Sequence, residues 1–303
     1  MKSDEKKTLD MEFVSQLFEK YGEGPVDAAV STRVQETISA IHPDACSPEV
    51  LKSIFRCLDL TTLNPEDNEK TARKFTNRLN GFSSRFPNIP PVAALCVYPS
   101  LVEETRKTLS DLRVKIAAVG AGFPSSQTYL AVKLAECELL ISKGTDEIDV
   151  VISVGRFLAG DYLGVFNELV LIRDACQGVT LKVILETGLL KSARKIRLAS
   201  LLAMEAGADF IKTSTGKVAV SATPEAVLTM SYAIRDFHSK SGRAAGIKPA
   251  GGIVTVEDAL IYYYLVNNIL GENWLTPSRF RLGASRLANN LLSRLSNQEI
   301  LYF

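Results

Sequence analysis

Eight short runs rich in valine and isoleucine recur along this chain, and helical patterns separate them. The runs lie at 54–60, 92–98, 114–120, 147–153, 181–187, 208–214, 244–250 and 279–285. Between them, segments such as 125–144 and 192–207 carry apolar residues at i, i+3, i+4 and i+7, which predicts helices with one buried face. Units of about 30 residues in this alternation predict parallel strands joined by helical crossovers.

Eight such units over about 250 residues match a (β/α)8 TIM barrel in count and length. A doubly wound open sheet is the alternative that the same pattern allows. The first 50 residues lack the alternating strand and helix patterns of the rest of the chain. They are polar, have a helical pattern and are interrupted by Gly-Glu-Gly-Pro at 22–25. We therefore expect an N-terminal helical extension at 1–50 and a barrel domain at 51–303.

The charge and cysteine content exclude several classes of function. Thirty-five basic and 34 acidic residues leave a net charge of +1, so neither nucleic acid nor an anionic membrane is an expected partner. No apolar run reaches the roughly 18 residues of a membrane span, and no apolar stretch follows the basic start as in a secretory signal. Five scattered cysteines and two histidines make a metal site unexpected and favour the reducing cytoplasm.

Helix starts and stops are also marked in the sequence. Ser192, Thr223 and Thr255 precede helical patterns and are suited to cap them, and Pro224 follows Thr223 at the first helical position. Gly144 and Gly207 lie where helices are expected to end.

Four charged residues interrupt the apolar runs late, where a barrel carries its catalytic groups. They are Asp59, Asp149, Lys212 and Lys248. Lysine and aspartate are rarely buried without a partner, and a structural ion pair gains little over a hydrophobic replacement. Two lysines and two aspartates on otherwise apolar strands therefore point to chemistry rather than to salt bridges that only hold the barrel together.

Such a set is suited to forming an imine with a carbonyl substrate. A lysine attacks a carbonyl only as the free amine, and an isolated lysine has a pKa of about 10.4. A second ammonium about 5 Å away repels the first by roughly 3 kcal/mol, which lowers its pKa by about two units. Partial burial acts in the same direction, while the carboxylates can hold the second ammonium and move protons.

Small-residue loops follow the sixth, seventh and eighth runs, where barrels often bind phosphate through backbone N–H groups and a helix N-terminus. These loops lie at 213–217, 248–252 and 282–285.

Five motifs in this chain resemble the deoxyribose-phosphate aldolase family, which are class I, Schiff-base aldolases. They are DLTTLN at 59–64, EIDVV at 147–151, LKVILETG at 181–188, ADFIKTSTGKVAVSATPE at 208–225 and KPAGG at 248–252. The resemblance runs from about residue 54 to about residue 292. It implies a TIM barrel without metal or organic cofactor that cleaves 2-deoxy-D-ribose 5-phosphate reversibly to D-glyceraldehyde 3-phosphate and acetaldehyde.

The resemblance also implies a role for each matching position. Lys212 is the Schiff-base nucleophile, Lys248 the ammonium that lowers its pKa, Asp149 the proton-transfer carboxylate and Asp59 the partner of Lys248. Phosphate is held by Gly216, Lys217, Gly251, Gly252, Gly283 and Ser285. Thr62 and Cys96 line the pocket.

Two features depart from the family pattern. Arg286 stands where some relatives have a second serine, although a guanidinium also binds phosphate. Tyr302 is penultimate, whereas some relatives end in a tyrosine that reaches the site; we expect a packed or disordered terminus here. The alternatives are another Schiff-base aldolase or transaldolase, or a barrel kept as a scaffold or protein-interaction module. A homodimer is a further expectation, because dimers are common among such folds.

Overall fold

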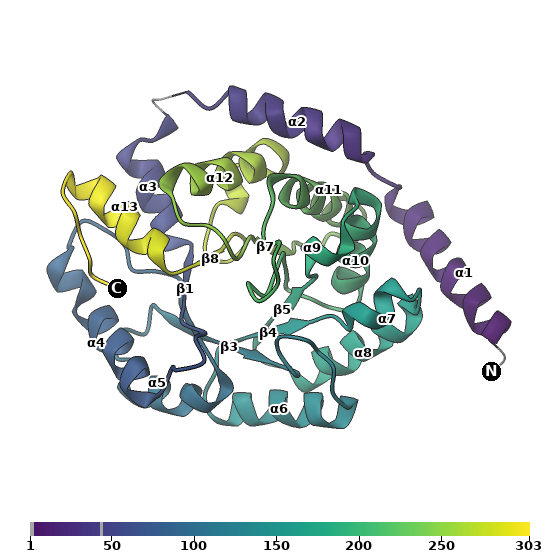
Figure 1. The fold of residues 1–303 in the computed structure, drawn as a ribbon, viewed down its shortest axis with the longest axis horizontal. Helices are drawn as coiled ribbons and strands as arrows, with labels where there is room; N and C mark the ends of the chain where they lie inside the picture. The colour runs from purple at the N-terminus through teal and green to yellow at the C-terminus, as the bar shows by residue number, and fades with distance from the viewer. Residues whose placement is uncertain (1–2, 43–44) are drawn as a thin grey trace.

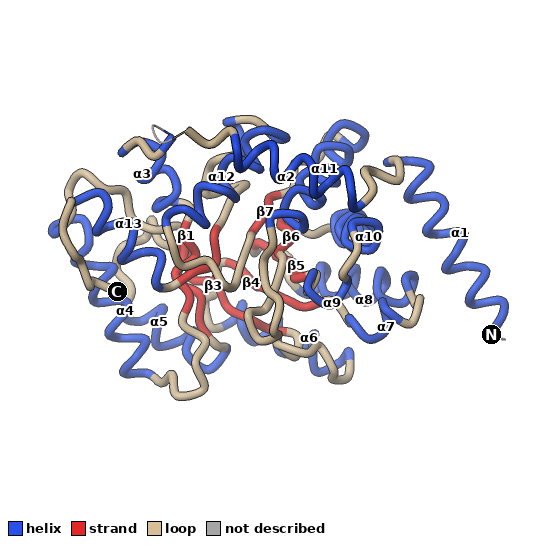
Figure 2. Tube along the Cα trace, turned by 45° about the horizontal axis from the view of Figure 1, so that its top comes forward, coloured by secondary structure: helices blue, strands red, loops and turns tan. Residues whose placement is uncertain are grey.

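The computed structural model describes residues 3–42 and 45–303, and eight parallel strands form its centre. They follow the order β7-β6-β5-β4-β3-β2-β1-β8. The strands are β1 (Leu58–Thr61), β2 (Ala94–Val97), β3 (Lys115–Gly120), β4 (Glu147–Val151), β5 (Thr180–Ile184), β6 (Phe210–Lys212), β7 (Gly246–Lys248) and β8 (Leu282–Ala284). Figure 2 shows them as a central group of strands surrounded by helices.

Two isolated bridges close the sheet into a barrel. Ile247 pairs with Phe280 and Ala250 pairs with Gly283, both in parallel, so the β7 end of the sheet meets the β8 end. The (β/α)8 prediction is confirmed, and the open doubly wound alternative is wrong because such a sheet would leave these two edges unpaired.

Helices form the outer ring of the barrel (Figure 1). They are α3 (Pro48–Arg56), α4 (Glu69–Arg85), α5 (Val102–Thr108), α6 (Leu130–Ser142), α7 (Val154–Leu158), α8 (Tyr162–Ala175), α9 (Thr187–Leu190), α10 (Ala193–Glu205), α11 (Pro224–Ser241), α12 (Val256–Leu270) and α13 (Arg286–Ser296). Short 3-10 turns lie at η2 (Pro99–Leu101) and η3 (Glu272–Trp274).

The first strand is shorter than its apolar run predicts. Residues 54–56 belong to α3, and β1 begins only at Leu58. The physical reason is the start of α3, where Ser47 accepts a hydrogen bond from the N–H of Val50 and Pro48 follows in the first turn. Once begun, the helix continues to Arg56 because Ile54 and Phe55 complete its buried face.

The predicted caps are confirmed. The hydroxyls of Ser192 and Thr223 accept hydrogen bonds from the backbone of α10 and α11, respectively. Thr255 and Asp258 form a reciprocal capping box at the start of α12, with both N–H···O distances at 3.0 Å. These caps determine where the helices begin and therefore where the preceding loops lie at the mouth of the barrel.

The N-terminal residues form two helices on the outside of the ring, α1 (Ser3–Tyr21) and α2 (Asp27–Ser39). α1 packs against α8, α10 and α11, and α2 packs against α10, α11 and α12. In Figure 1, α2 lies along the outside of α11 and α12. The first half of α1 is also held on the barrel, because Lys6 pairs with Asp161 at 2.9 Å and Asp10 accepts a hydrogen bond from the N–H of Leu163. The predicted boundary at residue 50 falls inside α3, so no break in secondary structure marks it, and the division into 1–50 and 51–303 stays a prediction.

Candidate active site

The four charged residues selected from the sequence meet inside the barrel. Lys212 and Lys248 end β6 and β7, which are neighbours with these two residues in register. Their Nζ atoms lie 2.8 and 2.7 Å from the same oxygen, Oδ2 of Asp149 on β4. The two amino groups are therefore no farther apart than the sum of these distances. Lys248 Nζ also lies 2.5 Å from Oδ2 of Asp59 on β1.

Three further buried ionic residues that sequence reasoning did not select belong to the same cluster. Lys182 on β5 contacts Asp59, Asp149 and Glu147 at 3.1, 3.0 and 2.5 Å. Arg281, just before β8, pairs with Asp59 and Glu147. The signal was present, because all three are charges in apolar runs. Glu147 and Lys182 come first and second in their runs, but Arg281 is third in its run, as the selected Asp149 is in its own.

The two candidate catalytic lysines have opposite electrostatic surroundings. Burial lowers the pKa of Lys212, and the Lys248 ammonium lowers it further, against the attraction of Asp149. Burial also favours the neutral form of Lys248, but Asp149 and Asp59 outweigh burial and raise the pKa of Lys248. The arrangement therefore favours one free amine beside one retained ammonium.

Both aspartates remain ionised in this setting. Burial alone would raise the pKa of Asp149, but Lys182, Lys212 and Lys248 hold that pKa well below its usual range. Arg281, Lys182 and Lys248 lower the pKa of Asp59 in the same way against its burial. A carboxylate that shares one oxygen with two lysines is placed to exchange protons with either of them.

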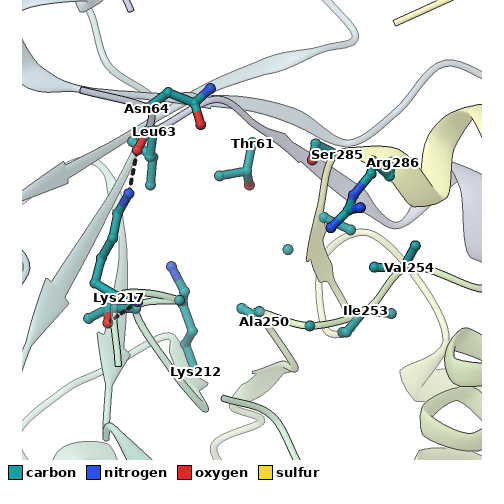
Figure 3. A pocket seen from close by; sticks show the side chains of 16 residues that line it. Thr61, Leu63, Asn64, Lys212, Lys217, Ala250, Ile253, Val254, Ser285 and Arg286 are labelled. Carbon is teal, nitrogen blue, oxygen red and sulfur yellow. Dashed lines mark hydrogen bonds between the residues drawn. The ribbon is translucent and has the colours of Figure 1, made fainter. Parts of the chain in front are cut away.

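A cavity of about 220 Å³ opens above Lys212 at the C-terminal ends of the strands. All six candidate phosphate ligands line it, as does Arg286: Gly216, Lys217, Gly251, Gly252, Gly283 and Ser285. Figure 3 shows Lys212 pointing into this space, with Lys217 on one side and Ser285 and Arg286 on the other. The structure thus brings the predicted phosphate set and the candidate nucleophile to one cavity.

Backbone groups dominate the wall opposite Lys217. Gly216 and Gly251 have φ values of +75° and +82°, and a Cβ on Gly251 would lie 2.6 Å from Oγ of Ser221. Only glycine permits this approach of the two loops. Ser285 is the N-cap residue of α13, its side chain makes no capping hydrogen bond, and it is exposed. The first N–H groups of an 11-residue helix therefore face this cavity, which suits an anion.

Lys217 reaches across the mouth of the cavity. Its ammonium donates a hydrogen bond to the backbone carbonyl of Leu63, as Figure 3 shows. Its own loop is held by Glu186, whose carboxylate accepts hydrogen bonds from the hydroxyl and N–H of Thr215 at 2.5 and 3.2 Å. Glu186 has a φ of +55°, an unfavourable conformation for a side chain of this kind, so the surrounding structure holds it in place.

Two predicted pocket residues are not among those that line the cavity. Thr62 is buried and donates its hydroxyl to Asp67 at 2.6 Å. Cys96 is buried in a small cluster with Leu63, Ala94, Ala117 and Val119, and its burial raises the pKa of the thiol. That they line the pocket stays a prediction, because the Cys96 thiol lies close enough to Lys212 and Lys248 for their charges to act on its pKa.

The C-terminal tyrosine lies outside the cavity. Tyr302 donates its hydroxyl to the backbone carbonyl of Arg78 on α4 at 2.6 Å and packs against Phe82 and Phe86. Asn289 on α13 fixes the backbone of the same tail by accepting hydrogen bonds from the N–H groups of Tyr302 and Phe303. The terminus is packed, as expected from the sequence.

Within the described part of the chain, no three histidine, cysteine, aspartate or glutamate side chains gather as metal ligands would. Among the same residues, no helix combines the length and hydropathy needed to cross a membrane.

The structure is a closed (β/α)8 barrel. At the C-terminal ends of its strands it holds a lysine of lowered pKa beside a second ammonium, which is the architecture of a class I aldolase. The chain belongs to the DeoC/LacD aldolase family, whose sequence profile matches residues 58–267.

Named relatives agree with this family. A deoxyribose-phosphate aldolase of Agrobacterium fabrum is 44% identical over 80% of this chain and 90% of its own. The human deoxyribose-phosphate aldolase is 40% identical over 77% of each chain. The barrel is similar to the solved structure of a deoxyribose phosphate aldolase from Aeropyrum pernix, described as tetrameric, with a TM-score of 0.62, 24% identity and coverage of 87% of this chain and 97% of that one.

Proposed function

We propose that this protein is a deoxyribose-phosphate aldolase, which cleaves 2-deoxy-D-ribose 5-phosphate reversibly to D-glyceraldehyde 3-phosphate and acetaldehyde. The observation that carries the proposal is the shared contact of Lys212 and Lys248 with one oxygen of Asp149, below a cavity lined by glycine loops. The names of the relatives that match most of this chain support the same substrate.

The reaction starts at the free amine of Lys212. Its Nζ attacks the C1 aldehyde of the open-chain sugar, and loss of water with uptake of one proton from solvent leaves a protonated imine; the final hydrolysis returns that proton to solvent. The 3-hydroxyl gives its proton to Asp149, directly or through a water molecule, and the C2–C3 bond breaks with its electron pair moving toward the imine. D-Glyceraldehyde 3-phosphate leaves, and an enamine of two carbons remains on Lys212.

The same carboxylate completes the cycle. The enamine takes up a proton at C2, which the Asp149 system held from the previous step, and water hydrolyses the resulting imine. Acetaldehyde leaves and the amine of Lys212 is restored, so protons balance over one turnover. Lys248 remains an ammonium throughout because Asp59 and Asp149 hold it.

The phosphate of the substrate binds the far side of the cavity. We propose three kinds of ligand for it: the backbone N–H groups near Gly251, Gly252 and Gly283, the N-terminus of α13 at Ser285, and the cations of Lys217 and Arg286. Binding energy from this end orients the carbonyl beside Lys212. Thr62 and Cys96 are proposed to support the pocket from beneath its surface.

The proposed chemistry requires no cofactor, because the lysine imine is itself the electron sink. The partner is then a small phosphorylated sugar rather than nucleic acid or membrane. A homodimer remains a prediction, which sedimentation tests. A cytoplasmic location also remains a prediction; it is favoured by the five cysteines, which form no disulfide among the described residues, and cell fractionation tests it.

Borohydride trapping is the deciding experiment. The protein is reduced in the presence of 2-deoxyribose 5-phosphate, digested and mapped by mass spectrometry. We expect a stable adduct on Lys212 and its loss in Lys212→Met, whose retro-aldol rate should fall at least about a thousandfold. An adduct on another lysine, or none with an active protein, contradicts the assignment. An intact barrel without turnover of any aldol substrate would instead favour the scaffold alternative.

A further inference from the structure

A second layer of ionic residues lies below the proposed catalytic set. Glu147 and Asp149 are two residues apart on β4, so both side chains face the barrel interior, one layer below the other. Both carboxylate oxygens of Glu147 contact Arg281, at 2.7 and 3.1 Å, and Oε2 lies 2.5 Å from Nζ of Lys182. All three side chains are buried.

This layer contacts both carboxylates of the layer above. Lys182 binds Oδ1 of Asp149, the oxygen that Lys212 and Lys248 leave free, and also Oδ2 of Asp59. Arg281 binds the other oxygen of Asp59 at 2.5 Å. The two aspartates that attract Lys212 and Lys248 are thus already partly neutralised from below.

Counting charges over the cluster shows an imbalance. Four cations, the three lysines and Arg281, face three carboxylates, so the fully ionised cluster carries one excess positive charge. In a buried site such a charge is unfavourable, and loss of one proton removes it.

The contacts identify which lysine gives up that proton. Lys182 contacts three carboxylates and Lys248 contacts two, whereas Lys212 contacts one, through a single oxygen that Lys248 shares. The other groups that face Lys212 do not alter the count. Cys96 on β2 is a neutral thiol, and β3 contributes apolar Ala117 and Val119 to this interior. At the rim, the cations Lys217 and Arg286 line the same cavity but are exposed to solvent, which screens them, and the Glu186 carboxylate accepts hydrogen bonds from Thr215.

We infer that Lys182, Glu147 and Arg281 are positioning residues whose summed charge keeps Lys212 a free amine near neutrality. The inference rests on the proposed role of Lys212 and extends it to residues that do not touch the substrate. Removing one cation from the lower layer gives three cations and three anions with Lys212 protonated, so its proton is retained. Removing the Glu147 charge leaves four cations and two anions, so the proton is lost more readily.

Competitive acetylation tests the inference without any sugar substrate. The folded protein is treated with trace acetic anhydride across a pH series, and mass spectrometry measures labelling of Lys212 relative to exposed Lys107. Lys182→Met should move the midpoint for Lys212 upward by about one pH unit, and Glu147→Gln should move it downward. The double variant should return it toward the wild-type value, and Arg281→Lys, which keeps the charge, should leave it unmoved.

Shifts of the Lys212 midpoint in opposite directions in Lys182→Met and Glu147→Gln distinguish an effect of charge from an effect of altered packing. Midpoints that stay in place, or that move in the same direction in both single variants, overturn the inference. If Lys182→Met does not fold, Glu147→Gln decides alone, because it changes charge with almost no change in volume. Cleavage of 2-deoxyribose 5-phosphate is measured separately, so an absent cleavage activity refutes the proposed function while the labelling shifts still test the charge count.

Discussion

Two lysines at the mouth of the barrel differ in what their surroundings allow them to do. Burial lowers the pKa of Lys212, and the Lys248 ammonium lowers it further against the attraction of Asp149, which favours the free amine. Lys217 lies at the cavity wall and donates a hydrogen bond to a backbone carbonyl, at a place that an incoming anion can reach. In the proposed mechanism, chemistry and anchoring are therefore divided between side chains five residues apart.

The anchoring role predicts a substrate-dependent defect. Lys217→Ala should raise KM for 2-deoxyribose 5-phosphate about tenfold to a hundredfold, because one charge-assisted hydrogen bond is lost. KM for unphosphorylated 2-deoxyribose should change little. Steady-state kinetics with both sugars make the comparison, and Lys195→Ala, an exposed lysine on α10, is the matched control. Equal effects on both sugars would argue against contact with phosphate.

The electrostatic role of Lys248 predicts a shifted pH profile. Wild-type activity should rise with pH as Lys212 loses its proton, since the free amine exists above its pKa. Lys248→Leu removes a repelling charge, so the pKa of Lys212 should increase and the rise of kcat/KM should move upward by about one to two pH units. A variant that is slower but keeps the wild-type profile would refute this role.

At the scale of elements, the link between α1 and α2 is attached to the barrel through one buried side chain. Arg197 on α10 donates to the carbonyl of Tyr21 at 2.5 Å and to that of Gly22 at 2.9 Å, and pairs with Asp236 at 2.8 Å. A Cβ on Gly24 would lie 2.5 Å from Cδ of Arg197, so the link wraps closely around this side chain. The Gly-Glu-Gly-Pro interruption is therefore the point at which the N-terminal helices are fastened.

Breaking this attachment should reduce stability. Arg197→Met should lower the free energy of unfolding by about 2 kcal/mol, because it leaves one buried carbonyl, one partly buried carbonyl and part of a carboxylate without a donor. Urea denaturation measures the change. Arg194→Met, an exposed arginine on the same helix, should cost less than about 1 kcal/mol. Equal losses in the two variants would mean that the link is not held as described.

At the scale of the whole molecule, the end of the chain fastens the barrel where its first and last units meet. Tyr302 and Phe303 pack on Phe82 of α4, while Asn289 of α13 holds their backbone. In Figure 1 the C-terminus lies between α4 and α13, outside the strand ring. The tail therefore contributes to stability at a place separate from the cavity.

A conservative change separates stability from catalysis here. Tyr302→Phe should lower the free energy of unfolding by about 1 kcal/mol through loss of the hydrogen bond to Arg78, with kcat unchanged. Thermal unfolding and the aldol assay measure the two quantities, and Tyr129→Phe, at an 83% exposed position, is the control. A tenfold fall in kcat at unchanged stability would instead place this hydroxyl in the reaction.

Much of the candidate site was predictable because charges stand out in apolar strands. Asp59, Asp149, Lys212 and Lys248 were found in this way, and their meeting inside the barrel follows the prediction. Lys182, Glu147 and Arg281 are likewise charged residues in apolar runs. They were missed because the search looked for one set of catalytic side chains at the strand ends and not for a second layer of ionic residues below them. Thr62 and Cys96 were placed on the cavity wall, but whether a neighbour covers a side chain depends on packing that no motif records.

The order and kind of the elements could be read from local patterns, since periodicity, caps and glycine stops act over a few residues. Which charges share an oxygen depends instead on how distant strands meet in the folded barrel. Lys248 and Asp149 are 99 residues apart in the chain and meet because the β7 edge closes on β8 and sets the stagger of every strand. The pKa of Lys212 depends on that closure, because distances and burial, not residue types alone, determine the electrostatic energy.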